Sequence, residues 1–426
     1  MEKDRNTELS GDGAPSQEEV AQDTVLWEEP IEEHTTQEAS VTPTSNKKEE
    51  GPSIVKAPKR KGTTGWDVVW AFSKFFWRMA LGLVLAVAIL AAGLVGYLTV
   101  TEYHPAYAET ADRGSVNRSE TITSRSFSIL SFNTGYGGLG QDADFFMDGG
   151  QGVLPTDETL VEDNVAGILG ILDVSDADFL MLQEVDTDSA RSFGTNQWLK
   201  YEHELEDYES RFALNYSCDY VPYPFTEPMG KINSGLATYS SYDIVSATRY
   251  SLPVPYAWPT RVANLKRCLL VTRIPIEDSE QQLVLINVHT EPYDDTGIYK
   301  EQTKQLVNLI KEEYAKGNFV IAGGDFNQAF PDSDAFPVKD PSFWTPGKLT
   351  RLSGGFRYFC DDSTPTCRLL NQPYDPDSEN TQYYAIDGFL VSPNIIVDDV
   401  KTLDYDFLYS DHNPVRLNFT LNFDSE

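Results

Sequence analysis

The chain has 426 residues, of which 33 are Lys or Arg and 66 are Asp or Glu, so its formal net charge is −33. This charge argues against a high-affinity nucleic-acid binder held by phosphate contacts, because such a binder needs a basic surface. Four cysteines in so long a chain exclude a small disulfide-built protein. The length predicts one large or two ordinary domains, with enough chain for a buried core.

The N-terminal stretch is strongly acidic. Residues 1–50 contain 14 acidic and four basic side chains, and Trp27 is the only aromatic residue among them. Such a segment buries too little apolar surface to offset the entropy lost on ordering. We therefore predict a disordered acidic tail over residues 1–65, on the cytoplasmic side. A tail that recruits a cytoplasmic partner is the alternative.

An uncharged apolar run follows. Residues 79–100 are 22 residues without a charged side chain, and about 20 are enough for a helix to cross the hydrocarbon layer. Trp66, Trp70, Trp77 and Tyr97 sit at the two ends of the span, where aromatic rings favour the membrane interface. The sequence thus predicts a transmembrane signal-anchor helix over 79–100, so that the membrane is one partner of the chain.

The charges on the two sides of this run differ in sign. The N-terminal flank carries Lys56, Lys59, Arg60, Lys61, Lys74 and Arg78, whereas the other side opens with Glu102, Glu109 and Asp112. By the positive-inside rule this predicts a single-pass cell-membrane protein with a cytoplasmic N-terminus and an extracellular remainder. The competing interpretation is a cleaved signal peptide with a cleavage site at Ala106-Tyr-Ala108. The long acidic leader and the long apolar run disfavour it.

The part beyond the membrane is predicted to hold a linker, residues 101–123, and a domain, residues 124–426. Residues 101–426 carry 23 basic and 51 acidic side chains, a net charge of −28, and all four cysteines. An oxidising exterior permits disulfides, and we expect Cys360–Cys367 first, with unpaired buried thiols as the alternative. Without a CxxC or a His/Cys cluster, no structural zinc site is expected.

Short apolar and β-branched runs recur along this domain, with two helical patterns between them. Glu158–Leu172 and Tyr299–Tyr314 show apolar residues at helical spacing. Strands outnumber helices and often follow one another directly, which favours an α/β (α+β) domain with two packed mixed sheets and helices on their outer faces. The predicted strands are Phe127–Phe132, Phe179–Val185, Leu236–Tyr239, Cys268–Ile274, Gln282–Val288, Phe319–Ala322, Ile386–Ser392 and Val415–Phe423.

Polar residues stand where these strands end, and strand-end loops on a rigid scaffold are where catalytic residues usually converge. Any one of them has a structural explanation, such as an Asx turn or a helix cap. Six such ends in one domain indicate a site. They read "SFNTG", "LQEVD", "NVHT", "GGDFN", "AIDG" and "SDHNP".

With these motifs the chain resembles the endonuclease/exonuclease/phosphatase superfamily, the deoxyribonuclease-I-like hydrolases, over roughly Phe127 to Phe423. The series "SFNTGYGG", "LQEVDTDSAR", "SGLATYS", "NVHT", "GGDFN", "IDGFLVS" and "SDHNPV" occurs in the family's order. The resemblance implies a four-layer sandwich of two mixed β-sheets flanked by helices. It also implies cleavage of phosphoester bonds by water with a divalent cation, Mg²⁺ or Mn²⁺.

The resemblance also implies individual roles. Glu184 is the principal metal ligand, with Asn133 beside it and Asp411 completing the metal site. Asp325 is the base that orients water, and Asn327 positions phosphate and water next to it. His289 and His412 bind phosphoryl oxygens and stabilise the developing charge. Asp387 orients His412 through a hydrogen bond and raises its pKa.

The chain departs from the family pattern at several positions. Gly135 stands where some relatives carry an Asp, and Ser241-Tyr242 follow "SGLATYS" where nucleases often have a basic residue. Tyr383 and Tyr384 occupy positions where some branches place an Arg, and the tryptophan-cysteine-basic stretch of inositol phosphatases is missing. These departures leave the substrate class open.

The sequence therefore predicts a membrane-anchored, metal-dependent phosphoesterase outside the cytoplasm. A phosphoester is its substrate, and a phosphodiester of a nucleic acid or a lipid headgroup is favoured. The charge of −28 weakens the nucleic-acid version, so stable nucleic-acid binding is not expected. The alternatives are a phosphomonoesterase acting on sugar or inositol phosphates and a catalytically silent binding module of the same fold.

Overall fold

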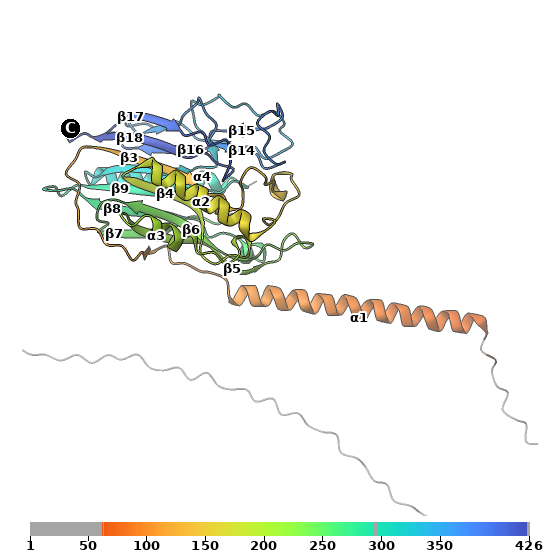
Figure 1. Ribbon diagram of the computed structural model, residues 1–426. Coiled ribbons are helices and arrows are strands. Elements are labelled where there is room, and N and C mark those ends of the chain that lie inside the picture. Colours follow the sequence, from red (N-terminus) through yellow and green to blue (C-terminus); the bar gives the residue numbers. More distant parts are fainter. Residues whose placement is uncertain (1–61, 63, 294–295, 424–426) are drawn as a thin grey trace, which may run out of the picture. The chain divides into compact units, whose positions relative to one another are not determined.

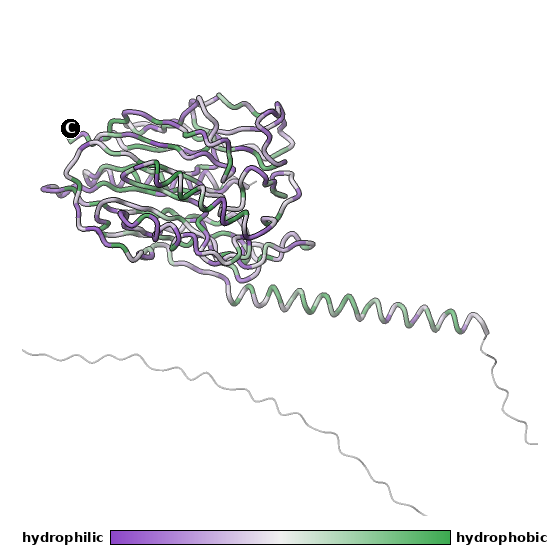
Figure 2. The backbone as a smooth tube through the Cα atoms, viewed as in Figure 1, coloured by the Kyte–Doolittle hydropathy of each residue, from purple (hydrophilic) through white to green (hydrophobic). Residues whose placement is uncertain are grey.

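The computed structural model describes residue 62 and residues 64–293 and 296–423. Most of the predicted acidic tail lies outside these residues. The described chain begins with α1 (Gly65–Val100), which contains the predicted span and is drawn as a single long helix in Figure 1. Figure 2 shows that most of its length is hydrophobic. Within the described residues, α1 is the one helix long and apolar enough to cross a membrane, judged by length and composition.

Two seven-stranded mixed sheets form the centre of the domain that follows α1. The first sheet has the order β1 (Ala108–Thr110), β7 (Ser246–Ser251), β8 (Cys268–Pro275), β9 (Gln282–His289), β10 (Phe319–Asp325), β16 (Asp387–Val391), β13 (Arg357–Phe359). The second has the order β17 (Ile395–Thr402), β18 (Val415–Leu421), β3 (Ser126–Asn133), β4 (Phe179–Asp186), β6 (Gly230–Ser240), β5 (Glu209–Val221), β2 (Asp112–Arg113). In each sheet one central pair is parallel, β9 with β10 and β3 with β4.

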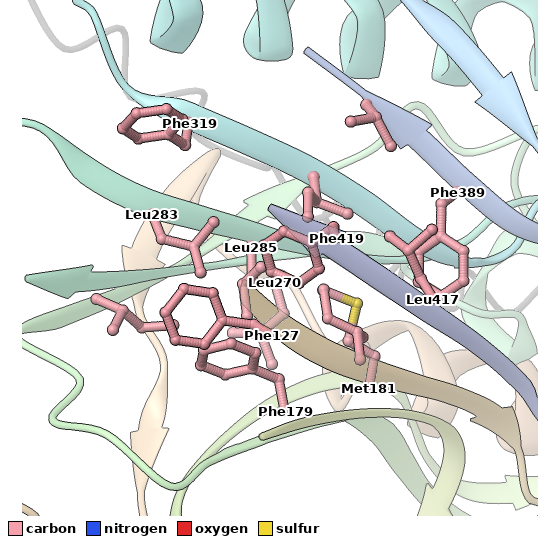
Figure 3. Packing of buried hydrophobic residues seen from close by; sticks show 14 of the residues in the cluster. Phe127, Phe179, Met181, Leu270, Leu283, Leu285, Phe319, Phe389, Leu417 and Phe419 are labelled. Carbon is pink, nitrogen blue, oxygen red and sulfur yellow. The ribbon is translucent and has the colours of Figure 1, made fainter. Parts of the chain in front are cut away.

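The layers follow from which side chains each strand buries. The largest core cluster lies between the two sheets, and Figure 3 shows its aromatic and aliphatic side chains interdigitating. A second cluster packs α2 (Glu158–Ser175) and α3 (Gln197–Glu204) on the outer face of the β3–β4 sheet. A third packs α4 (Ile298–Ala315) on the outer face of the other sheet. The predicted four-layer sandwich of two mixed sheets flanked by helices is confirmed.

The smaller elements connect these layers. Every predicted strand and both predicted helices are present, with bounds that differ by a few residues. Residues 101–123, predicted as a linker, contain β1 and β2, which add an edge strand to each sheet. The remaining elements are η1 (Gly135–Gly137), η2 (Phe146–Asp148), η3 (Ala190–Ser192), η4 (Thr260–Ala263), β11 (Gln328–Ala329), β12 (Gly347–Lys348), β14 (Cys367–Arg368) and β15 (Tyr383–Tyr384).

The expected Cys360–Cys367 disulfide is wrong, because all four cysteines are free. Cys367 is buried in β14 and forms a β-bridge with His412. Cys360 follows β13, and its Sγ lies 3.7 Å from the Asp362 carboxylate. The pairing of β14 with β15 therefore holds Cys367 in the interior by backbone hydrogen bonds, without a covalent bridge across the intervening turn.

The double glycine at the end of β10 is needed for close packing of the strands. Gly324 has φ +145°, and a Cβ built on it lies 2.0 Å from the backbone oxygen of Val288 in β9. We expect Gly324→Ala to lower the free energy of unfolding by about 3 kcal/mol or more, from backbone strain and overlap together.

The matched control is Gly170→Ala in α2, where a Cβ meets nothing within 4 Å. Because Ala favours a helix interior over Gly by up to about 1 kcal/mol, this variant should melt at the same or a higher temperature. Thermal unfolding of both variants in detergent measures the difference. Equal melting temperatures would contradict the packing account.

Candidate active site

The site lies where strands of both sheets end. In the first sheet the register places Asp325 of β10 opposite His289 of β9 on one side and Asp387 of β16 on the other. In the second sheet Asn133 ends β3, next to the parallel strand β4 that carries Glu184. Because the parallel strands of each sheet end at a common edge, side chains far apart in sequence meet there.

Glu184 reaches this edge through an irregularity in its own strand. The register of β4 against β6 shifts between Leu182 and Val185, and Glu184 has a left-handed backbone with φ +56°. A bulge of this kind redirects one side chain out of regular alternation, and bulges are over-represented next to active sites. The strain of a left-handed glutamate is held by the pairing on both sides of it.

Asn133 joins the two carboxylates at the centre of the site. Its Nδ2 lies 3.1 Å from Asp325 Oδ2 and 3.3 Å from Glu184 Oε1. Its Oδ1 accepts a hydrogen bond from the Gly135 amide, and its backbone oxygen accepts one from Ser410 Oγ. Residues of both sheets are thus held against the loop that carries Asp411 and His412.

The carboxylate of Asp325 is buried and held from two directions. Its Oδ1 accepts a hydrogen bond of 2.8 Å from the Asn327 amide, and Asn327 Nδ2 lies 3.3 Å from its Oδ2. Asn327 takes a left-handed backbone (φ +47°) and also donates from Nδ2 to the Thr290 oxygen. Burial, reinforced by the nearby Asp387, raises the pKa of Asp325 to about 7. A carboxylate with this pKa takes up and releases a proton near neutral pH.

The two histidines differ in charge. Burial alone would lower the pKa of His412, but Asp387, Cys367 and Asp411 together outweigh it and raise that pKa well above its ordinary value. Asp387 Oδ2 lies 2.9 Å from His412 Nδ1, and both side chains are buried. Burial, together with Arg267 and His412, lowers the pKa of His289 well below its ordinary value. These shifts favour the imidazolium form of His412 and the neutral form of His289, whose Nε2 lies 3.5 Å from Asp325 Oδ2.

These side chains line a single pocket of about 180 Å³. The structure brings all eight predicted site residues together: Asp387 lies behind His412, and the other seven line the pocket, namely Asn133, Glu184, His289, Asp325, Asn327, Asp411 and His412. The roles assigned to them by resemblance stay predictions.

The donor set fits a hard divalent cation. The carboxylates of Glu184 and Asp411 line the same pocket, and Mg²⁺ prefers oxygen ligands. Asn133 lies beside them, with its Nδ2 toward Glu184 and its Oδ1 bonded to the Gly135 amide. Burial raises the pKa of Asp411 to about 6, and the Glu184 carboxylate adds to the effect.

Two further groups of side chains could offer metal ligands. Within each group the ligand atoms all lie within 4.8 Å of one another. Both groups include His412, one with Cys367 and Asp411 and the other with Asp325 and Asp387. An imidazolium, with a proton on both ring nitrogens, cannot ligate a metal, and Asp387 favours this form of His412. Of the described pocket residues, Glu184 and Asp411 could therefore hold a cation through their carboxylate oxygens.

The structure adds pocket residues that the sequence analysis did not single out. Tyr293 Oη donates a hydrogen bond of 2.6 Å to Asp148 Oδ1, and both side chains line the pocket. Asp148 lies in η2 and Tyr293 follows β9, 145 residues away, so no local pattern points to the pair. Burial raises the pKa of both groups.

Two guanidinium groups also line the pocket, and each is paired with a carboxylate. Arg191 donates two hydrogen bonds to Asp186, at 2.9 and 3.0 Å, and stacks on the Tyr136 ring. Arg267 Nε lies 3.0 Å from Glu291 Oε2. Arg191 ends the "LQEVDTDSAR" motif, so the sequence offers a signal for it. Arg267 lies in none of the motifs, so the sequence offers no signal for it. The positive charge available to an anionic substrate is therefore limited.

Comparisons with known proteins agree with this geometry. Residues 130–412 match the model of the Endonuclease/Exonuclease/phosphatase family, and no curated protein matches the chain. A solved endonuclease/exonuclease/phosphatase from Beutenbergia cavernae is 18% identical, with a TM-score of 0.51, and the match covers 70% of this chain and 72% of that one. At this identity the likeness shows the fold.

Two further solved structures are more distant. TDP2 from Caenorhabditis elegans is 16% identical with a TM-score of 0.41, and the match covers 69% of this chain and 75% of that one. ANGEL2, described as a 2′,3′-cyclic phosphatase and solved with adenosine-2′,3′-vanadate, is 15% identical with a TM-score of 0.44. That match covers 73% of this chain and 100% of ANGEL2.

Proposed function

The chain belongs to the endonuclease/exonuclease/phosphatase family of phosphoester hydrolases, and we propose that it hydrolyses phosphodiesters with a bound divalent cation while anchored in a membrane. The observation that carries the proposal is the convergence of Glu184, Asp325 and His412, with their partners, on one pocket. Each of these side chains is fixed by buried hydrogen bonds or by backbone geometry, as a preorganised site requires.

We assign the proton-transfer role to Asp325. With a pKa raised by burial, its carboxylate accepts a proton from water more readily than an ordinary Asp does. The Asn327 amide and side chain hold both carboxylate oxygens, so the lone pair that receives the proton points in a fixed direction. Water oriented in this way attacks phosphorus, and the ester P–O bond opposite it breaks.

The histidines are suited to the phosphoryl oxygens. His412 carries a positive charge stabilised by Asp387, so it attracts the oxygens on which negative charge builds up. Neutral His289 offers an N–H donor without adding to the total charge. The carboxylates of Glu184 and Asp411, with Asn133 beside them, would hold Mg²⁺ or Mn²⁺, which would supply further charge neutralisation.

The pairing of the arginines favours a diester over a monoester. A phosphate monoester carries about one more negative charge at neutral pH than a diester does. Since Asp186 neutralises Arg191 and Glu291 neutralises Arg267, the pocket offers little extra charge for a dianion. The site thus matches a singly charged phosphodiester better.

The test compares two chromogenic substrates on the purified full chain with Mg²⁺. We expect kcat/KM for bis-p-nitrophenyl phosphate to exceed that for p-nitrophenyl phosphate by at least about tenfold. Faster hydrolysis of the monoester would favour the phosphomonoesterase. Hydrolysis of neither would favour a silent binding module.

We further propose that α1 spans the cell membrane with the catalytic domain outside. The support is its apolar length and the basic residues on its N-terminal side. Protease added to intact cells should remove a C-terminal tag and leave an N-terminal tag protected. The reverse pattern would overturn this orientation.

Replacing Asp387 with Asn should move both limbs of the pH profile of kcat/KM to lower pH. Activity needs Asp325 as the carboxylate and His412 as the imidazolium, so it is lost as pH falls through the first pKa and as pH rises through the second. The Asp387 charge raises both pKa values. Removing it lowers both, and pH–rate profiles of the variant and wild type measure the displacement. Unmoved limbs would contradict the assignment.

A further inference from the structure

Exposed aromatic side chains stand on the hairpin between β5 and β6 and on the loop before η4, and the hairpin and η4 share one apolar cluster. On the hairpin, Phe225 is 83% exposed and Tyr223 is 53% exposed. The centroids of their rings lie 5.9 Å apart, in an edge-to-face arrangement. Tyr220 on the hairpin and Trp258 on the loop are also exposed. We call these four residues the aromatic tip. Large exposed apolar groups that lie together mark an interaction surface.

The loop that carries Trp258 lies at the C-terminal end of α1. Trp258 Nε1 donates to Thr99 Oγ1 at 3.0 Å, and the Glu102 carboxylate pairs with Arg261 at 3.2 Å and with Lys266 at 3.3 Å. Only Thr101 separates the helix end, Val100, from the buried Glu102. Two residues span about 7 Å at most, so the loop stays beside the helix end whatever angle the helix takes.

The aromatic tip also borders the catalytic pocket. Tyr216, Met229 and Leu265 line the pocket and belong to the apolar cluster that includes Leu98 of α1. The Tyr223 ring contacts the Phe146 ring at 5.6 Å, and both neighbours of Phe146 in the chain line the pocket. One apolar wall therefore runs from the end of α1 past the tip to the active site.

The chemistry of the tip matches a bilayer surface. Residues 220–230 read "YVPYPFTEPMG" and contain no Lys or Arg. A nucleic acid would need basic residues there, whereas aromatic rings favour the level of the lipid headgroups. If α1 spans the bilayer, as in the proposed function on which this inference rests, the tip stands at that level.

We propose that the aromatic tip seats in the outer membrane interface and that the pocket takes a phospholipid from the same leaflet. The phosphodiester of the lipid headgroup reaches the carboxylates and histidines while its apolar part stays along the wall of Tyr216, Met229 and Leu265. Water adds to phosphorus and one ester P–O bond breaks, so the products are a phosphomonoester and an alcohol.

The test uses the full chain in nanodiscs of phosphatidylcholine and phosphatidylglycerol with Mg²⁺. Two rates are measured on each sample: cleavage of the nanodisc lipids and cleavage of soluble bis-p-nitrophenyl phosphate. The variant is Phe225→Asp, which puts a charge into the tip. The control is Val174→Asp, an equally drastic change at a 71% exposed position near the end of α2. Phe225→Trp keeps an aromatic ring at the tip.

We expect Phe225→Asp to lower the lipid rate by about tenfold and to leave the soluble-diester rate within about twofold. Val174→Asp and Phe225→Trp should keep both rates. An unchanged lipid rate in Phe225→Asp, or wild-type cleavage of the soluble diester with none of the lipids, would overturn the inference and leave the proposed function standing. Failure of wild type on the soluble diester would instead count against the proposed function.

Discussion

Replacing Asp325 with Asn is expected to lower kcat for a phosphodiester by about a thousandfold, because general-base catalysis contributes rate factors of about that size. Asn has nearly the same shape, and its oxygen can still accept the 2.8 Å hydrogen bond from the Asn327 amide. What it cannot do is take a proton from water. Steady-state kinetics on bis-p-nitrophenyl phosphate measure the loss, with KM expected to change little.

The melting temperature of the Asp325→Asn variant shows whether the variant is still folded. Asp325 is buried and its pKa is raised, so a neutral Asn removes a charge that is costly to bury. Against this gain, the new Nδ2 would face the Nδ2 donors of Asn133 and Asn327. Because the two effects oppose each other, the variant should melt close to the wild-type temperature. A stable variant that keeps kcat within tenfold of wild type would show that another group accepts the proton.

The second large effect is expected at Glu184. Glu184→Gln should lower kcat/KM at limiting Mg²⁺ by at least about a hundredfold, because it removes a charged ligand from the proposed cation site. Part of the loss should return at high Mg²⁺, since Asn133 and Asp411 remain. Rates measured across a Mg²⁺ titration, with calorimetric Mn²⁺ binding alongside, separate weaker binding from impaired chemistry.

Glu204→Gln is the matched control, because Glu204 ends α3 with a side chain that is 62% exposed. It should bind Mn²⁺ and turn over as wild type does. If Glu184→Gln also bound Mn²⁺ with unchanged affinity, the cation site would have to lie at other ligands of the pocket.

The sequence pattern predicts the central strands well, because those strands are apolar on both faces. Strand β5 escapes detection, since Glu209 and Arg211 interrupt its pattern. The structure buries both by pairing them at 2.6 Å, and Arg211 also donates to the Ile244 oxygen. A buried ion pair of this kind arises from tertiary structure and leaves no trace in local periodicity. The edge strand β17 is missed for a similar reason, because Asp398 and Asp399 interrupt its apolar pattern.

The candidate site is predictable where its residues end strands, as Asn133, His289 and Asp325 do. The Asp148–Tyr293 pair is not predictable, because Asp148 ends the short helix η2, Tyr293 lies in a loop, and they meet only through the fold. The left-handed backbone of Glu184 likewise cannot be predicted from the sequence. The motif "LQEVD" does identify Glu184 as a candidate site residue.

The most direct measurement is the Mg²⁺ dependence of bis-p-nitrophenyl phosphate hydrolysis by the purified full chain, with Asp325→Asn beside it. The site described here predicts turnover that stops in EDTA, returns when Mg²⁺ is restored, and is nearly absent in the variant under all three conditions. Hydrolysis that persists in EDTA, or that proceeds equally in wild type and Asp325→Asn, would contradict a metal-dependent phosphoesterase built on this pocket.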